Sequence, residues 1–117
     1  MRELCHTEYA YTGADGQRHD GPEAHLAMAQ MFATAVSDAK IEIRSVHSAG
    51  DIVIVEFIGR GTHQGELLGI APTGRQITMP VCTVIELRSG KIYAEREYMD
   101  MAHMMQQLGV MPAPATA

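Results

Sequence analysis

The carboxylates of Glu95 and Glu97 are the side chains of this sequence best suited to proton-transfer chemistry. They lie in the segment Lys-Ile-Tyr-Ala-Glu-Arg-Glu-Tyr-Met at residues 91–99, which also carries several apolar residues. Apolar surroundings cannot hydrate a charged carboxylate, so they disfavour the charged form and raise its pKa toward neutrality. Such a group can accept and return a proton without a metal or a cofactor.

Strand alternation places Glu95 and Glu97 on one face, opposite Ala94 and Arg96. Burying two carboxylates together is unfavourable, so two interpretations stay open. Either that face is polar, with Glu97 in solvent or paired with Arg96 or Arg75, or it is buried and one carboxylate raises the pKa of the other.

The composition argues against several other classes of function. The chain has 117 residues, enough for one domain, and a net charge of −5 with no basic stripe, so we expect no nucleic-acid partner. It lacks an apolar run of membrane-spanning length and a secretion signal, so we expect a cytoplasmic protein that binds no membrane.

Cys5 and Cys82 suit a reducing compartment as structural thiols. The six histidines, of which His19 and His25 come nearest to a pair, lack metal-site spacing, so we expect neither metal nor cofactor.

The N-terminal part of the chain predicts a strand, a loop and a helix. Residues 4–11 alternate like a strand that carries Tyr9 and Tyr11 on one face. Residues 12–21 hold three glycines and no large apolar residue, which is typical of a loop. A helix over 22–39 follows, with a proline as its first residue. Its apolar stripe contains Leu26, Met28, Ala29, Met31, Phe32, Ala33, Ala35 and Val36.

Strands dominate the rest of the chain. The pattern predicts them at residues 41–44, 52–61, 76–87 and 91–98. Ile41 and Ile43 alternate with charged residues, which indicates a half-buried strand. Gly50-Asp51 marks a turn before residue 52. The irregular connection at 62–75 and the turn at Ser89-Gly90 make the last three strands an antiparallel meander.

Asp100 is expected to cap a final helix, because its side-chain oxygen can accept from free backbone N–H groups, and Gly109 ends that helix. The apolar stripe of this helix contains Met101, Met104, Met105 and Leu108. We therefore expect one α+β domain at residues 1–111 and a flexible tail at 112–117. A helix packed on a strongly curved sheet leaves a pocket in which a small molecule can bind.

Several segments resemble the SnoaL-like polyketide cyclase family, within the nuclear-transport-factor-two-like superfamily. Gly-Thr-His-Gln-Gly-Glu-Leu-Leu-Gly-Ile-Ala-Pro-Thr-Gly-Arg at 61–75 resembles its central signature, and residues 89–101 resemble its last strand and helix start. Shorter similarities lie at residues 6–9, 21–23 and 106–110. The resemblance covers nearly all of 4–111, and it is more specific for fold than for reaction.

The resemblance implies a cone-shaped α+β barrel, a cystatin-like roll in which a curved antiparallel sheet packs on helices around a deep apolar pocket, often in a dimer. It also implies an intramolecular aldol closure, with a carboxylate of the last strand as general acid and base. The segment from Arg96 to Asp100 falls on the Arg-Asp-Tyr-Phe-Asp motif of limonene-type epoxide hydrolases in the same superfamily. This match assigns the reactive carboxylate to Glu97 and a structural role to Asp100.

The sequence departs from these relatives in three places. The epoxide hydrolases need an Arg-x-Asp pair where this chain reads Val55-Glu56-Phe57-Ile58-Gly59, which argues against epoxide opening by the familial mechanism. Glu56 itself lies either on the outer face or inside as a second acid. Five residues precede His6, so most of the usual N-terminal helix is missing. Arg96 stands where many members have tryptophan.

The expected site combines these residues. Tyr9 and Tyr11 would be catalytic with Glu97, by holding an enolate oxygen, although ordinary core packing explains them equally well. His63, in the signature loop, is a candidate for substrate binding or an ordinary surface histidine. The expected substrate-binding residues are His63, Met79, Val81, Thr83, Glu95, Met99 and Met104.

The leading functional hypothesis is a cofactor-independent lyase or isomerase of polyketide-cyclase type. Glu97 would carry the proton of a carbonyl compound whose apolar or aromatic body fills the pocket, and the protein would be a homodimer. Two alternatives stay open: a non-catalytic small-ligand binding module, and an epoxide hydrolase with a rearranged site.

Overall fold

The computed structural model of the chain describes residues 2–110, so the flexible tail expected at 112–117 lies outside the described residues. The described chain forms one mixed sheet and two α-helices. The strands are β1 (Cys5–Thr12), β2 (Arg18–Asp20), β3 (Lys40–Ala49), β4 (Ile52–Thr62), β5 (Gln76–Arg88) and β6 (Lys91–Met99), and the helices are α1 (Glu23–Ala35) and α2 (Met101–Gln107). None of the helices within residues 2–110 has the length and hydropathy needed to cross a membrane.

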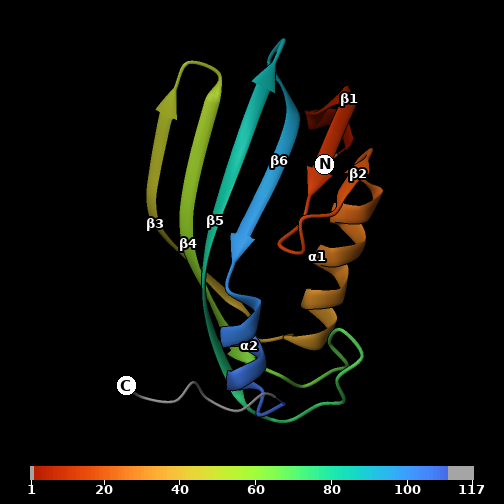
Figure 1. Cartoon of the computed structure of the whole chain (residues 1–117), viewed down its shortest axis with the longest axis vertical. Helices are drawn as coiled ribbons and strands as arrows, with labels where there is room; N and C mark the ends of the chain where they lie inside the picture. Colours follow the sequence, from red (N-terminus) through yellow and green to blue (C-terminus); the bar gives the residue numbers. More distant parts are fainter. Residues whose placement is uncertain (1, 111–117) are drawn as a thin grey trace.

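The sheet has the strand order β2-β1-β6-β5-β4-β3. Figure 1 shows β3 to β6 side by side as a meander, with α1 beside β1 and β2. The predicted antiparallel meander of the last three strands is confirmed, and β3 extends it by an antiparallel pairing with β4, whereas β1 and β6 are parallel. The α+β prediction is therefore confirmed, and the sheet is mixed rather than wholly antiparallel. A short 3-10 helix at Arg2–Leu4 precedes β1 in the described chain.

The region expected to be a loop at residues 12–21 contains the short strand β2. It pairs with β1 through Tyr11 and His19. Its three residues are exposed and polar, so no apolar alternation marked it as a strand.

Helix α1 ends at Ala35, earlier than the expected Ala39. Beyond it, the carbonyl oxygen of Ala35 accepts the N–H groups of Gln64 and Gly65 at 2.8 and 3.0 Å. The β4–β5 connection therefore occupies the end of α1, below the helix in Figure 1. The early end of the helix results from this tertiary contact, so the spacing of the apolar residues within the helix could not predict it.

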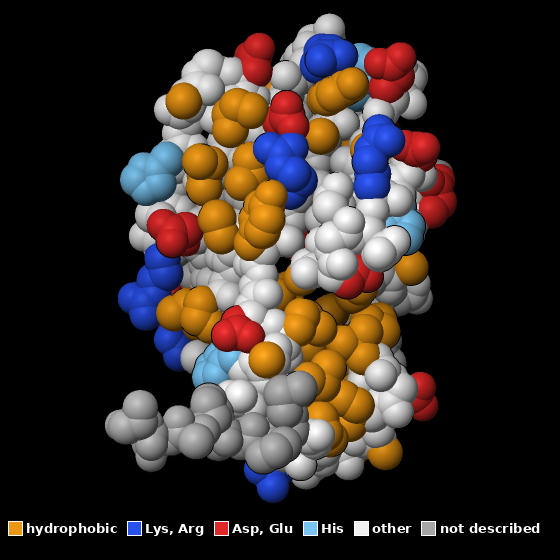
Figure 2. All heavy atoms as spheres, viewed as in Figure 1, with side chains coloured by type: hydrophobic (Ala, Val, Ile, Leu, Met, Phe, Trp, Pro, Cys, Tyr) orange, Lys and Arg blue, Asp and Glu red, His pale blue; other side chains and the backbone are white. Residues whose placement is uncertain are grey.

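Strand β3 is longer and more exposed than predicted. Ile41 and Ile43 are each 63% exposed, because β3 is an edge strand with a single strand neighbour. Figure 2 shows apolar side chains grouped at the surface over the upper half of the sheet, with charged side chains between them. Large apolar side chains that reach the surface include Leu4, Ile41, Ile43, Val46, Leu68, Tyr98 and Val110.

Two buried clusters flank the space between α1 and the sheet. The larger one joins the end of α1 to β5 and α2, and its buried members are Ala35, Val36, Leu67, Ile77, Met79, Val81, Met104 and Leu108. The smaller one consists of Cys5, Tyr9 and Tyr11 and packs against Ala24 and Ile92. The predicted cap of α2 is confirmed, since Asp100 Oδ1 accepts the N–H of His103 at 3.0 Å. This cap holds the turn from β6 into α2, and α2 closes one end of the space.

Candidate active site

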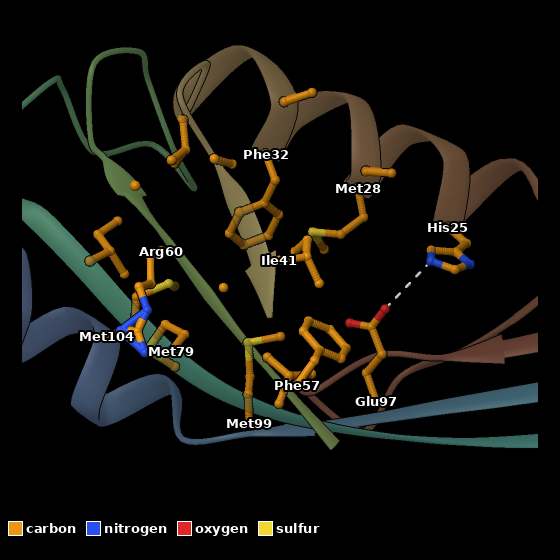
Figure 3. A pocket seen from close by; sticks show the side chains of 18 residues that line it. His25, Met28, Phe32, Ile41, Phe57, Arg60, Met79, Glu97, Met99 and Met104 are labelled. Atoms are coloured by element: carbon orange, nitrogen blue, oxygen red, sulfur yellow. Dashed lines mark ion pairs between the residues drawn. The ribbon is translucent and has the colours of Figure 1, made fainter. Parts of the chain in front are cut away.

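A cavity of about 450 Å³ lies between α1 and strands β4, β5 and β6 (Figure 3). This size is within the range of small-molecule sites. Its described walls are formed by His25, Met28, Ala29, Phe32, Ala33, Val36, Ala39, Ile41, Phe57, Gly59, Arg60, Gly61, Ile77, Met79, Val81, Glu97, Met99 and Met104. Most of these side chains are apolar, and several are methionines or phenylalanines that adapt to an aromatic ligand.

The structure brings five of the predicted site residues to the cavity wall. They are Glu97, Met79, Val81, Met99 and Met104. Thr83 does not line the cavity, although it is the register partner of Glu97 on β5. His63 is fully buried away from the cavity, and its Nδ1 accepts the Thr73 N–H at 3.2 Å. Its Nε2 has no hydrogen-bond partner within the described chain.

Glu97 provides the polar end of the cavity together with His25. The Glu97 side chain is 17% exposed, and its Oε1 lies 3.5 Å from Nε2 of His25 (Figure 3). His25 comes from the first turns of α1 and was not among the expected site residues. The sequence did contain a signal for it, because His25, Met28, Ala29 and Phe32 follow the i, i+3, i+4, i+7 spacing of one helix face.

Glu95 binds the other side of the same histidine. Its Oε2 lies 2.9 Å from Nδ1 of His25, and Glu95 is only 6% exposed. The predicted shared face of Glu95 and Glu97 is therefore confirmed, and that face is buried. The partner of the two carboxylates is His25 rather than an arginine, since Arg96 pairs with Glu86.

Tyr9 and Tyr11 complete the surroundings of the His25 ring. The Tyr9 hydroxyl lies 3.2 Å from Nδ1 of His25. The Tyr11 ring stacks on the imidazole with 4.6 Å between centroids and 6° between planes. Neither tyrosine lines the cavity, so the structure does not place them where an enolate oxygen would bind. They hold the groups that do line it.

The electrostatics of this cluster favour a charged histidine. The hydrogen bond to Glu95, with the charges of both carboxylates, raises the pKa of His25, although burial opposes that shift. Burial raises the pKa of Glu97, while the charge of His25 and a hydrogen bond with Tyr11 oppose it. Burial is also the main cause that raises the pKa of both tyrosines, which therefore stay protonated as donors.

Glu56 faces away from this cluster. Its register partner on β5 is Cys82, its side chain is exposed, and its Oε1 accepts the Ser45 hydroxyl at 2.8 Å. It therefore adds no second acid to the cavity from β4, where an epoxide hydrolase would need its Arg-x-Asp pair.

Comparison with known proteins agrees with the fold. Residues 1–108 match the SnoaL-like polyketide cyclase family, and the chain belongs to that family. It is 30% identical to the aklanonic acid methyl ester cyclase AcmA of Streptomyces galilaeus, over 99% of this chain and 81% of the relative. It is 28% identical to the nogalonic acid methyl ester cyclase of Streptomyces nogalater, over 78% of this chain and 69% of the relative.

Solved structures show the same fold at lower sequence identity. A protein from Jannaschia sp. CCS1 assigned to the SnoaL-like polyketide cyclases has a TM-score of 0.86 at 22% identity, with 95% of this chain and 77% of that chain covered. TsrD from Streptomyces laurentii has a TM-score of 0.81 at 22% identity, with 94% and 81% covered.

Proposed function

We propose that this protein is a cyclase-type enzyme that closes a ring in a carbonyl compound by cofactor-independent acid and base catalysis. One observation carries the proposal: Glu97 is the carboxylate that reaches the wall of an otherwise largely apolar cavity in the described chain. Burial raises the pKa of Glu97, which suits a group that must both accept and return a proton. Family membership and the printed names of the two cyclase relatives support the same class of reaction.

The reaction needs only proton transfer and one new carbon–carbon bond. Ionised Glu97 removes a proton from a carbon next to a carbonyl group, and the electron pair of that C–H bond moves toward the carbonyl oxygen to give an enolate. The enolate carbon then attacks a second carbonyl carbon of the same molecule. Protonated Glu97 returns its proton to the new alkoxide, so the product is an isomer of the substrate and Glu97 is regenerated.

The walls of the cavity define the substrate class. Met28, Phe32, Phe57, Met79 and Met99 offer large apolar and aromatic surface. Glu97 and His25 lie together at one end, and Arg60 lies away from them beside Met79 (Figure 3). We therefore infer an apolar or aromatic polyketide whose reacting carbonyl lies at the His25–Glu97 end. The proposal includes the homodimer that the family resemblance implies.

Blocking the cavity tests this function. Ala29 and Ala27 are both exposed residues of α1, but only Ala29 of the two lines the cavity. With aklanonic acid methyl ester and nogalonic acid methyl ester as probes, we expect the wild type to form a ring-closed isomer of the same mass. Ala29→Phe should lose about tenfold or more of that activity through steric exclusion, and Ala27→Phe should keep it.

Chromatography with mass spectrometry measures both products. Binding of either probe without any isomer formation by the wild type would contradict the enzyme and favour a binding module. Equal activity in Ala29→Phe and Ala27→Phe would show that the reaction does not occur in this cavity.

A further inference from the structure

We propose that His25 is a second catalytic group of the cavity, which donates its Nε2–H to the substrate oxygen while Glu97 takes the carbon-bound proton. This inference rests on the proposed function, and it adds His25 as a general acid to Glu97 as the general base. It concerns the one residue of the polar end that pattern and family resemblance did not select.

The two nitrogens of His25 have different surroundings. Nδ1 lies 2.9 Å from Glu95 Oε2, a distance typical of a charge-assisted hydrogen bond, and the Tyr9 hydroxyl lies 3.2 Å away. Nε2 lies 3.5 Å from Glu97 Oε1, longer than an ordinary hydrogen bond. Glu95 therefore occupies the Nδ1–H, and the Nε2–H stays available to a substrate oxygen that approaches from the cavity beside Glu97.

The groups around His25 keep its ring oriented and charged. Glu95 and Glu97 face it from β6, and Tyr9 and Tyr11 face it from β1. The stacked Tyr11 ring and the Nδ1–H bond to Glu95 fix the plane of the imidazole. The hydrogen bond with Glu95 is also the largest cause of the raised pKa of His25, so the charged imidazolium is more favoured than in an ordinary histidine. Glu95 is accordingly a positioning residue that acts through His25.

An acid at this place completes the proton balance. As Glu97 takes the C–H proton, the carbonyl π pair moves onto oxygen, and Nε2–H passes its proton to that oxygen to give an enol and neutral His25. The Nδ1–H bond to Glu95 persists throughout. When the enol carbon attacks the second carbonyl, its O–H proton returns to Nε2, so His25 ends in its starting state.

A purely structural role predicts different behaviour. Glu95 and His25 join β6 to α1, so their ion pair could serve only to clamp the helix on the sheet. A clamp would not favour an oxygen-bearing ligand over its hydrocarbon analogue. The preference of the cavity for an oxygen atom therefore separates the two roles.

The test compares 2-naphthol with naphthalene as cavity probes at pH 7. We expect the wild type to bind 2-naphthol about ten- to hundredfold more tightly than naphthalene, the range for a hydrogen bond to a charged group. His25→Gln should remove most of that preference, whereas Glu97→Gln should keep it. Met28→Leu serves as the control, because it changes the apolar wall and should shift the affinities for both probes alike.

Glu95→Gln provides an independent second variant, since it leaves His25 in place and weakens its charge. We expect its preference for 2-naphthol to disappear at a lower pH than in the wild type. An unchanged preference in His25→Gln, or, should that variant not fold, an unchanged pH dependence in Glu95→Gln, would overturn the role of His25. These binding results are independent of turnover, so a failure here leaves the base role of Glu97 standing.

Discussion

Replacing Glu97 by glutamine is expected to lower the kcat of ring closure by about 100- to 10,000-fold, the usual effect of losing a general acid and base. Glutamine keeps the shape of the side chain but cannot accept the C–H proton at its uncharged amide. The affinity for the substrate should change little, because the apolar walls supply most of the contact area. Steady-state kinetics with the methyl ester probes, together with equilibrium binding, measures both quantities.

Glu95→Gln is the matched control for this substitution. Glu95 lies on the same face of the same strand, two residues away, but it does not line the cavity. Because it acts through His25, we expect a smaller loss of kcat and a shift of the high-pH limb of the kcat/KM profile to lower pH. Normal turnover by Glu97→Gln would mean that another group moves the proton.

The same two variants should change stability in opposite directions. The pKa of Glu97 in the folded protein is raised above its ordinary 4.5, because burial favours the protonated side chain. Its contribution to the stability of the fold is therefore fully present below pH 4.5 and is lost as pH rises through the pKa of the folded state. Glu97→Gln removes that buried charge and should raise the Tm at pH 7–8 but not at pH 4. A variant that loses activity while gaining Tm would separate catalytic function from support of the fold.

Glu95→Gln should instead destabilise the protein by about 1.5–3 kcal/mol near pH 6, the range for hydrogen bonds to charged groups. The pKa of His25 in the folded protein is raised above its ordinary 6.5. The stabilisation by its pairing with Glu95 is therefore fully present below pH 6.5 and is lost as pH rises through the pKa of the folded state. The difference between Glu95→Gln and the wild type should therefore shrink at high pH. Chemical denaturation across pH 5–9 checks the sign, and a difference that grows with pH would contradict it.

Gly61→Ala is expected to destabilise the fold by about 1–3 kcal/mol, the usual range for overpacking. A Cβ on Gly61 would overlap Val36 Cγ1 and lie 3.2 Å from Cα of Ala39, where the backbone cannot easily yield. It would also crowd Asp38, whose carboxylate accepts both the N–H and the hydroxyl of Thr62 at 2.8 Å. The clash would push the chain that follows α1 away from β4.

Gly59→Ala is the control on the same strand and the same face. A Cβ there meets only Ile41 Cδ1 at 3.8 Å, which is ordinary contact. Urea denaturation of both variants tests the packing of α1 on the sheet. Equal stabilities for Gly59→Ala and Gly61→Ala would contradict this packing.

Much of the fold follows from local patterns in the sequence. The turn at Ser89-Gly90, the alternation of Glu95 and Glu97 and the cap at Asp100 each depend on residues close together in the chain, and the structure agrees with all three. Strand β2 was missed because its three residues are polar and exposed, and the early end of α1 was missed because it depends on Gln64 and Gly65, far away in the sequence.

The candidate site was predictable only in part for the same reason. Alternation places Glu95 and Glu97 on one face, but it does not say what covers that face. The answer is His25 of α1, which lies within ion-pair distance of both carboxylates. Tyr9 and Tyr11 were predicted to hold an enolate oxygen, yet their hydroxyls point to the His25–carboxylate cluster rather than into the cavity.

Proton exchange at the reacting carbon tests the central claim most directly. Aklanonic acid methyl ester is incubated with the protein in D₂O, and deuterium uptake at its acidic C–H is followed by NMR and mass spectrometry. We predict that the wild type accelerates this exchange over buffer and that Glu97→Gln does not, even where that variant still binds the probe. Exchange by Glu97→Gln at the wild-type rate would contradict the assignment of Glu97 as the proton shuttle.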